Sequence, residues 1–199
     1  MTITTRDIFL AKIRAAQPAG RPRPDVPLFD TPPGERLERF RTALAAMGGT
    51  VVEGVSLDTV RALLAERFGV DAIVASAVPG IEGNRALAAD MPPVSLQDVD
   101  AGVVRARFGV AETGSVWFSE DEYIVNSIGY LVQHLVVLLD PAQIVDGLQD
   151  VYRRDDFKAA RYAVLVTGPS ATADIEGVLI RGAQGVRSLT VVWLAPNGG

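Results

Sequence analysis

Short apolar runs recur along the chain and are separated by amphipathic or glycine-containing segments. HLVVLLD (134–140), YAVLVT (162–167) and SLTVVWLA (188–195) are apolar almost throughout. Such runs are typical of strands buried on both faces, as in parallel sheets covered by helices. TVVEGV (50–55) and DAIVAS (71–76) are two further strand candidates. The pattern predicts an α/β domain with a mainly parallel sheet flanked by helices.

Helices are predicted between these runs, over four segments: ERLERFRTALAAM (35–47), LDTVRALLAERF (57–68), residues around 81–89, and AQIVDGLQDVYRR (142–154) after Pro141. The first segment has Leu37, Phe40, Leu44 and Met47 at three- and four-residue spacing. This spacing predicts one buried face. Ser56 and Gly69 bracket the second segment and are of the types that begin and end helices.

One hairpin is also predicted. RFGVAE (107–112) and SVWFS (115–119) are apolar runs separated by Thr113 and Gly114. Glycine readily adopts the positive φ that tight hairpin turns require. Because a hairpin pairs its strands antiparallel, we expect a mixed sheet.

The first 35 residues differ from the rest of the chain. Residues 3–16 have the spacing of a short amphipathic helix, with Thr4 or Thr5 as N-cap. Residues 17–34 are rich in proline, which predicts an extended linker. We therefore expect an arm and linker over residues 1–35 and one α/β domain over residues 36–199. The basic arm is either a solvated segment or a contact for an acidic partner.

Composition excludes several classes of protein. The chain has 199 residues, no cysteine and one histidine, so iron–sulfur ligation, thiolate zinc sites and cysteine nucleophiles are excluded, and we predict no metal site. A net charge of −5 argues against a nucleic-acid partner. No apolar stretch has the roughly 18 residues that a membrane span needs, and the N-terminus resembles no signal peptide. We expect a cytoplasmic protein without a membrane span.

The segment GPSATADIEG (168–177) is the first candidate site. It follows a predicted buried strand, and Thr172 is placed to cap a following helix. Helix N-termini beyond the carboxyl ends of parallel strands bind anions. Gly168 would let the backbone approach a ligand, and Ser170 and Thr172 would add hydroxyl groups, whereas Asp174 would lie in the first helical turn. An ordinary capped loop is the alternative.

The segment AETGS (111–115) and the single histidine are the other candidates. Glu112 ends an apolar run, and a carboxylate partly withdrawn from water can act as acid, base or nucleophile. Thr113, Gly114 and Ser115 would bind a ligand at the turn. His134 can transfer protons near neutral pH. The alternatives are a solvated turn glutamate and a hydrogen-bonded structural histidine.

Together these motifs resemble the lactate utilization protein C family, whose members carry a LUD domain. That family typically shows an A-[ED]-T-G-[ST] turn, a histidine at the start of the next strand, and a G-P-S-x-T-A-D-I-E segment before a glycine-rich turn. The correspondence falls on residues 112–115, on His134 and on residues 168–176, followed by Gly182 and Gly185.

The resemblance implies a fold like that of the ribose-phosphate isomerase, glucosamine-phosphate deaminase and CoA-transferase group. It also implies a role in oxidising L-lactate to pyruvate with iron–sulfur companion proteins. The chain would then be an accessory or catalytic subunit that binds a small carboxylate or phosphate at the two loops. Glu112 would be the acid or base and His134 would support it. We expect no cofactor in this chain, with the iron–sulfur clusters held by the partners.

Two other functions are compatible with the same residues. The chain could be a stand-alone isomerase or a CoA-transferase-like enzyme that uses Glu112. It could instead be a non-catalytic module that docks redox subunits through the basic arm.

Overall fold

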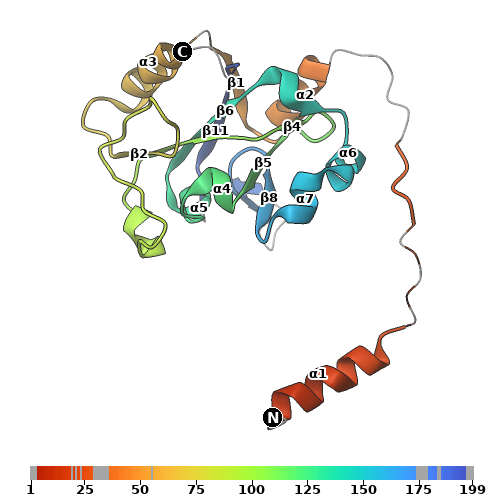
Figure 1. Cartoon of the computed structure of the whole chain (residues 1–199). Helices are drawn as coiled ribbons and strands as arrows, with labels where there is room; N and C mark the ends of the chain where they lie inside the picture. Colours follow the sequence, from red (N-terminus) through yellow and green to blue (C-terminus); the bar gives the residue numbers. More distant parts are fainter. Residues whose placement is uncertain are drawn as a thin grey trace.

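The computed structural model describes residues 4–18, 20, 22, 24–28, 36–54, 56–173, 179–182 and 185–195. Its centre is a five-stranded parallel sheet, called sheet A here (Figure 1). In spatial order its strands are β1 (Thr50–Glu53), β11 (Ser188–Trp193), β6 (His134–Leu139), β3 (Ala101–Arg105) and β2 (Val74–Ser76). β6 and β11 lie inside the sheet and are buried along almost their whole length, as their apolar sequences predict.

Helices cover sheet A on both faces. On β6, Leu135, Val137 and Leu139 belong to the core that includes the buried face of α2 (Arg36–Ala46). The alternate residues Val136 and Leu138 belong to the core beneath α3 (Leu57–Phe68). Successive side chains of a strand point to opposite faces. Sheet A therefore has an α2 face and an α3 face, and these names are kept below.

The predicted hairpin belongs to a second sheet, called sheet B. Its order is β7 (Ile144–Val145), β4 (Gly109–Val110), β5 (Ser115–Ser119) and β8 (Ala163–Val166). β4 pairs antiparallel with β5 and parallel with β7. The antiparallel pairing lies in sheet B rather than in the main sheet. β8 is an edge strand whose side chains are exposed or half-buried, so the prediction that 162–167 is buried on both faces is wrong.

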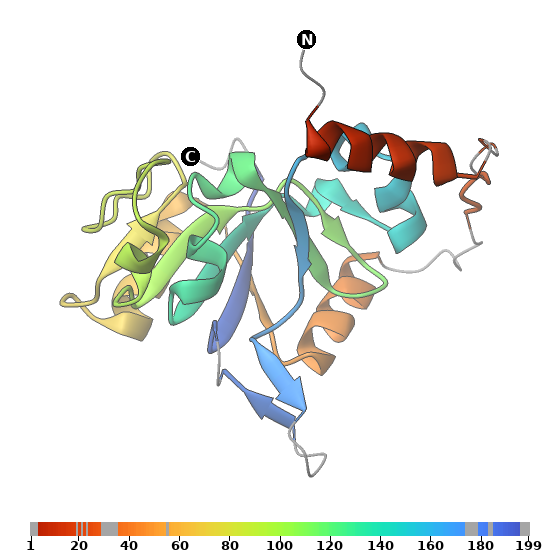
Figure 2. The same ribbon diagram turned by 90° about the horizontal axis from the view of Figure 1, so that it is seen from below.

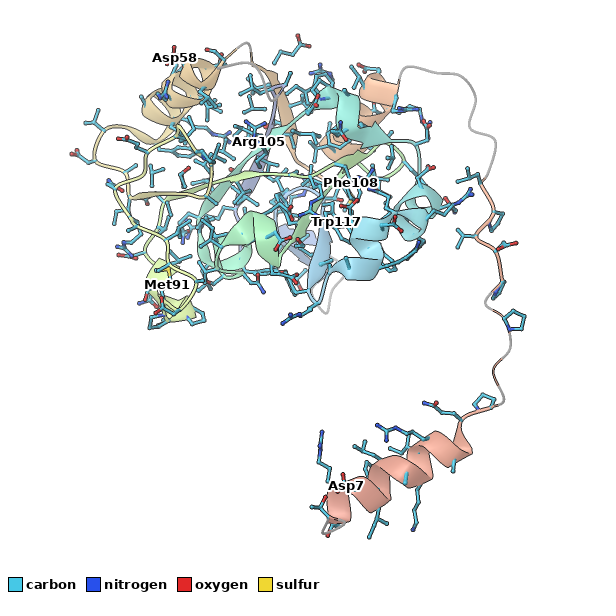
Figure 3. The ribbon with its side chains drawn as sticks, viewed as in Figure 1. Asp7, Asp58, Met91, Arg105, Phe108 and Trp117 are labelled. Carbon is cyan, nitrogen blue, oxygen red and sulfur yellow. The ribbon has the colours of Figure 1, made fainter. Side chains whose placement is uncertain are left out.

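Sheet B has a small core of its own. Phe108 and Trp117 lie close together in Figure 3 and stack with their ring centroids 5.2 Å apart. Val110 and Val151 complete this core, the latter from α6 (Leu148–Arg153). This packing supports the hairpin that carries the AETGS turn.

Three of the predicted helices are confirmed. α2 ends at Ala46 and α3 is capped by Ser56 and Gly69, although Leu37 and Met47 are exposed and only Phe40 and Leu44 of the predicted apolar stripe are buried. The N-terminal helix α1 (Thr5–Ala16) is capped by Thr4, and none of its residues is buried. Figure 1 shows it lying apart from the two sheets.

Two helical predictions fail. Residues 81–89 form no helix: Arg85 bridges to Ala75, and a Cβ at Gly83 would collide with the β2 backbone, so this segment follows the sheet edge. Residues 142–154 are divided into the end of a 3-10 turn, η2 (Pro141–Gln143), followed by β7 and α6. Buried Ile144 pairs with Gly109 there, and this tertiary contact overrides the helical pattern.

The sequence pattern also missed several elements. The most important is β3, which is almost completely buried in sheet A. The others are η1 (Pro93–Leu96), α4 (Glu120–Tyr123), α5 (Ile128–Leu131), α7 (Asp155–Ala159), β9 (Ala171–Ala173) and β10 (Leu179–Arg181). β9 and β10 pair antiparallel and project from the body of the domain (Figure 2). Within the described residues, no helix has the length and apolar character of a membrane span.

Candidate functional site

The turn of the AETGS segment packs against the end of α2. Gly114 adopts φ 64°, and a Cβ at this position would come under 3.0 Å from the backbone nitrogen of Leu44. Both the positive φ and the close approach require glycine. The hairpin turn is therefore held against the α2 backbone.

The GPS turn packs against the same end of α2. Gly168 adopts φ 63°, and a Cβ there would come under 3.0 Å from the carbonyl oxygen of Met47. Gly49, just before β1, lies against Gly168 as well, since its own Cβ would be 3.3 Å from the Gly168 Cα. The two predicted loops therefore converge at the carboxyl end of one helix.

A chain of hydroxyl groups joins the two loops. Thr113 Oγ1 lies 2.7 Å from Ser115 Oγ, which also forms a short hydrogen bond with Thr167 Oγ1. Ser115 is 4% exposed, so the middle hydroxyl is buried. Thr113, Ser115 and Thr167 are called the hydroxyl cluster below. The sequence motifs do not include Thr167, although its position directly before Gly168 is a signal that could identify it.

The prediction that Thr172 caps the start of a helix is wrong. Ala171–Ala173 form strand β9, which pairs with β10, and Thr172 is an exposed residue of this strand. The backbone N–H of Ser170 donates to the Val186 carbonyl over 2.8 Å, and its carbonyl accepts from Gly182 over 2.6 Å. Hairpin pairing thus takes the place of the expected helix. Asp174 lies outside the described residues.

The expected position relative to the main sheet is also wrong. β8 leads into Gly168, but it belongs to sheet B. Gly168 lies against Gly49, which directly precedes β1, and Ser170 bonds to Val186, which lies two residues before the start of β11. The GPS turn therefore lies at the amino ends of the sheet A strands rather than at their carboxyl ends.

Glu112 lies beside the hydroxyl cluster in sequence but points to another element. Its Oε2 accepts the backbone N–H of Leu148 over 3.0 Å, at the first residue of α6. Glu112 is exposed, so the expectation that apolar neighbours withdraw it from water is wrong. The exposed carboxylate can exchange protons directly with solvent or with a ligand at the turn.

His134 lies on the α3 face of sheet A. Its Nδ1 is 2.8 Å from Ser188 Oγ, and its ring stacks on Phe68 with centroids 4.9 Å apart. Burial, followed by the positive charges of Arg67 and Arg187, lowers the pKa of His134. The structure does not bring His134 into the hydroxyl cluster, because the turn glycines pack on α2 at the opposite face. Its hydrogen bond fits the structural alternative raised for this residue.

Within the described part of the chain, no group of three or more histidine, cysteine or acidic side chains could hold a metal ion. These segments offer hydroxyl groups, the exposed carboxylate of Glu112, and two exposed arginines, Arg67 and Arg187, near His134.

Comparisons with known proteins agree with this architecture. The family model described as LUD domain matches residues 93–194, just over half of the 199-residue chain, and this range contains both turns and His134. A crystal structure of a DUF162 family protein from Deinococcus radiodurans is similar, with a TM-score of 0.61 and 18% identity. The similarity covers 82% of this chain and 100% of that chain, and it shows the shared fold. No curated protein matches the chain. The chain belongs to the LUD domain family.

Proposed function

We propose that this protein is an accessory or catalytic subunit of a cytoplasmic system that oxidises L-lactate to pyruvate, together with iron–sulfur companion proteins. LUD domains are associated with lactate utilization proteins. Within that family, the paired AETGS and GPSATADIE motifs resemble the lactate utilization protein C group. The absence of cysteine from this chain leaves the clusters to the partners.

The observation that carries the proposal is the hydroxyl cluster between two glycine turns. Its hydroxyl groups can turn to donate hydrogen bonds, and carboxylate or phosphate oxygens accept them. Thr113 and Thr167 are half-buried and form the accessible ends of the cluster, whereas Ser115 is buried. A small carboxylate such as lactate would bind at Thr113, with Ser115 and Thr167 holding this hydroxyl in place.

Glu112 supplies the acid–base group in this proposal. Oxidation of lactate to pyruvate breaks the O–H bond, which releases a proton, and the Cα–H bond, which releases a second proton and two electrons. The exposed Glu112 carboxylate next to Thr113 would accept the hydroxyl proton. The companion proteins would take up the two electrons of the Cα–H bond through their iron–sulfur clusters, and its proton would leave to solvent. This chain contributes binding, orientation and proton transfer.

Ligand titrations and pathway assays of the same variants test the proposal. The purified protein is titrated calorimetrically with L-lactate, pyruvate and a sugar phosphate, and lactate-dependent reduction is measured with the companion proteins present. Ser115→Ala is expected to weaken binding, and Glu112→Gln is expected to lower turnover with little change in binding. Thr172→Ala, an exposed change on β9, is the matched control. The site assignment is wrong if no anion binds and both variants keep full activity.

A CoA-transferase-like enzyme is a second candidate, favoured by the exposure of Glu112 beside a glycine turn. Such an enzyme would form a thioester on this carboxylate. Incubation with acyl-CoA followed by borohydride or hydroxylamine would give a mass change on the peptide that contains Glu112. An unmodified peptide rules this candidate out.

The N-terminal arm offers a route to the partners. α1 has no buried residue and exposes Ile8, Phe9 and Ile13, and two basic residues, Lys12 and Arg14, lie near its end. Deletion of residues 1–33 is expected to abolish assembly with the companion proteins while leaving anion binding unchanged. Assembly of the truncated chain at the original affinity would exclude this role.

A further inference from the structure

We propose that Arg67, His134 and Ser188 form a second binding site, for a small oxyanion, at the amino ends of the sheet A strands on the α3 face. This site is separate from the hydroxyl cluster, which lies on the α2 side. The inference goes beyond the proposed lactate role and does not depend on it.

Hydrogen bonds hold the three side chains together. His134 Nδ1 is 2.8 Å from Ser188 Oγ, and Arg67 Nη2 lies 3.5 Å from the same oxygen. Arg67 Nη1 donates to Thr190 Oγ1 over 2.6 Å, and this threonine is 1% exposed. Thr190 Oγ1 is also 3.2 Å from Thr50 Oγ1. The guanidinium is therefore held by the buried Thr190 hydroxyl and the half-buried Ser188 hydroxyl.

The site carries positive charge that protein carboxylates do not balance. Arg67 and Arg187 both act on His134, and Asp100 is the carboxylate that acts against them. No ion pair joins either arginine to a carboxylate among the residues that the structure describes. Asp100 itself accepts the Ile73 backbone N–H over 2.8 Å. Guanidinium groups bind carboxylates and phosphates with matched geometry, so a bound oxyanion would supply the missing charge.

The site is open to solvent on one side. Arg67 is exposed and His134 is half-buried, and Phe68 covers a face of the imidazole ring. Because Ser188 engages Nδ1, Nε2 is the ring nitrogen that an anion would contact. The donors available to the ligand are the remaining N–H groups of Arg67 and the protonated Nε2, which suits a phosphate or a carboxylate group.

The single histidine makes the site measurable by NMR. His134 gives the only histidine C2–H resonance of the chain, so its titration with pH reports this site alone. The titration is recorded in chloride, in inorganic phosphate and in L-lactate at the same ionic strength. A bound anion stabilises the imidazolium, so we expect the apparent pKa of His134 to be higher in phosphate or lactate than in chloride.

Variants separate the second site from a general salt effect. In Arg67→Gln, the anion concentration needed to raise the pKa of His134 is expected to increase about tenfold or more. The reason is that a charge-assisted hydrogen bond to the anion is lost. Arg67→Lys keeps the positive charge and the fold, and is expected to weaken anion binding less than Arg67→Gln does. Arg61→Gln is the matched control, because Arg61 lies on the same helix and pairs with Asp58. Ser115→Ala is expected to keep the shift even where it lowers lactate binding at the hydroxyl cluster.

Each outcome decides between the alternatives. A shift in phosphate alone identifies a phosphoryl ligand, and a shift in lactate alone identifies a carboxylate; both support the site. Titration curves that coincide in all three anions overturn it, as does an Arg67→Gln protein that folds and keeps the full shift. Loss of the shift in Ser115→Ala would also overturn it, because the two sites would then be one.

Discussion

The Oγ atoms of Ser115 and Thr167 form a hydrogen bond although the two residues lie 52 positions apart in the chain. They stand where β5 begins and just after β8 ends, and these strands are antiparallel neighbours that pair Val116 with Val166. The sheet B register therefore brings the two loops together. The integrity of the hydroxyl cluster depends on this pairing as much as on the loops themselves.

Ser115→Ala is expected to lower the free energy of unfolding by about 1 kcal/mol, or somewhat more, because it removes the partner of both threonine hydroxyls in a buried position. Urea denaturation measures the change. Thr172→Ala is exposed and should stay within about 0.5 kcal/mol of the original protein. Equal stability of the two variants would show that the hydroxyl cluster does not hold the loops.

Gly114→Ala is expected to destabilise the protein much more than Gly69→Ala. Both glycines have positive φ, 64° and 80°, so alanine is strained at either position, by roughly 1–3 kcal/mol. A Cβ at Gly114 also collides with the α2 backbone, whereas one at Gly69 meets nothing within 4 Å. The difference between their thermal unfolding midpoints isolates the contact with α2. Equal midpoints would mean that the turn moves away from α2 at no cost.

Much of the fold follows from local patterns that agree with the tertiary structure. β6 and β11 are apolar because both of their faces are buried. The Ser56 side chain caps α3 by accepting the backbone N–H of Asp58. Thr113 and Gly114 also specify the hairpin turn correctly. At these positions the local preference and the long-range packing favour the same conformation, so a single sequence is informative.

The failures come from contacts between distant residues. GPSATADIEG has the signature of a helix start, yet Ala171–Ala173 pair with β10, a partner that local sequence does not reveal. Residues 162–167 are apolar, but their place at the edge of sheet B is set by the pairing with β5. His134 is separated from the hydroxyl cluster because alternate residues of a strand point to opposite faces of the sheet. Predicting this separation requires knowing which helix covers which face of sheet A.

Glu112→Gln is expected to change stability by less than about 1 kcal/mol. The amide oxygen can still accept the Leu148 N–H, so only the attraction between the carboxylate and the amino end of α6 is lost. Circular dichroism during thermal unfolding checks this value. With stability preserved, a loss of lactate-dependent turnover reports the proton transfer proposed for this residue. A large loss of stability would instead give Glu112 a structural role.

Arg107→Ala is expected to lower the free energy of unfolding by about 2 kcal/mol. Arg107 contacts Glu122 over 2.7 Å, Asp156 over 3.0 Å and Asp121 over 3.2 Å. The Glu122 side chain is 11% exposed, so removal of the guanidinium leaves a nearly buried carboxylate without its counter-charge. Lys158→Ala breaks an exposed pair with Asp155 and should cost under about 0.5 kcal/mol. Similar urea midpoints for the two variants would contradict this account.

The pH dependence of stability should carry a contribution from His134. Its pKa in the folded protein is lowered from 6.5, chiefly by burial, so in the window below pH 6.5 the unfolded chain binds more protons than the folded chain. Stability then falls as pH falls through this window, with a slope of at most about 1.4 kcal/mol per pH unit.

His134→Gln tests this sign directly. The variant lacks the titrating group, so it should lose less stability than the original protein between neutral pH and the folded-state pKa of His134. Asp98 and Asp156 have a pKa lowered from 3.8 by their arginine partners, so their contribution is lost in a more acidic range and is common to both proteins. Urea midpoints measured across the pH range in chloride give the comparison.

In phosphate, an anion bound beside Arg67 would favour the imidazolium in the folded state, so the gap in stability between the two proteins should narrow or change sign. A gap of the same size in both anions would mean that phosphate does not reach His134.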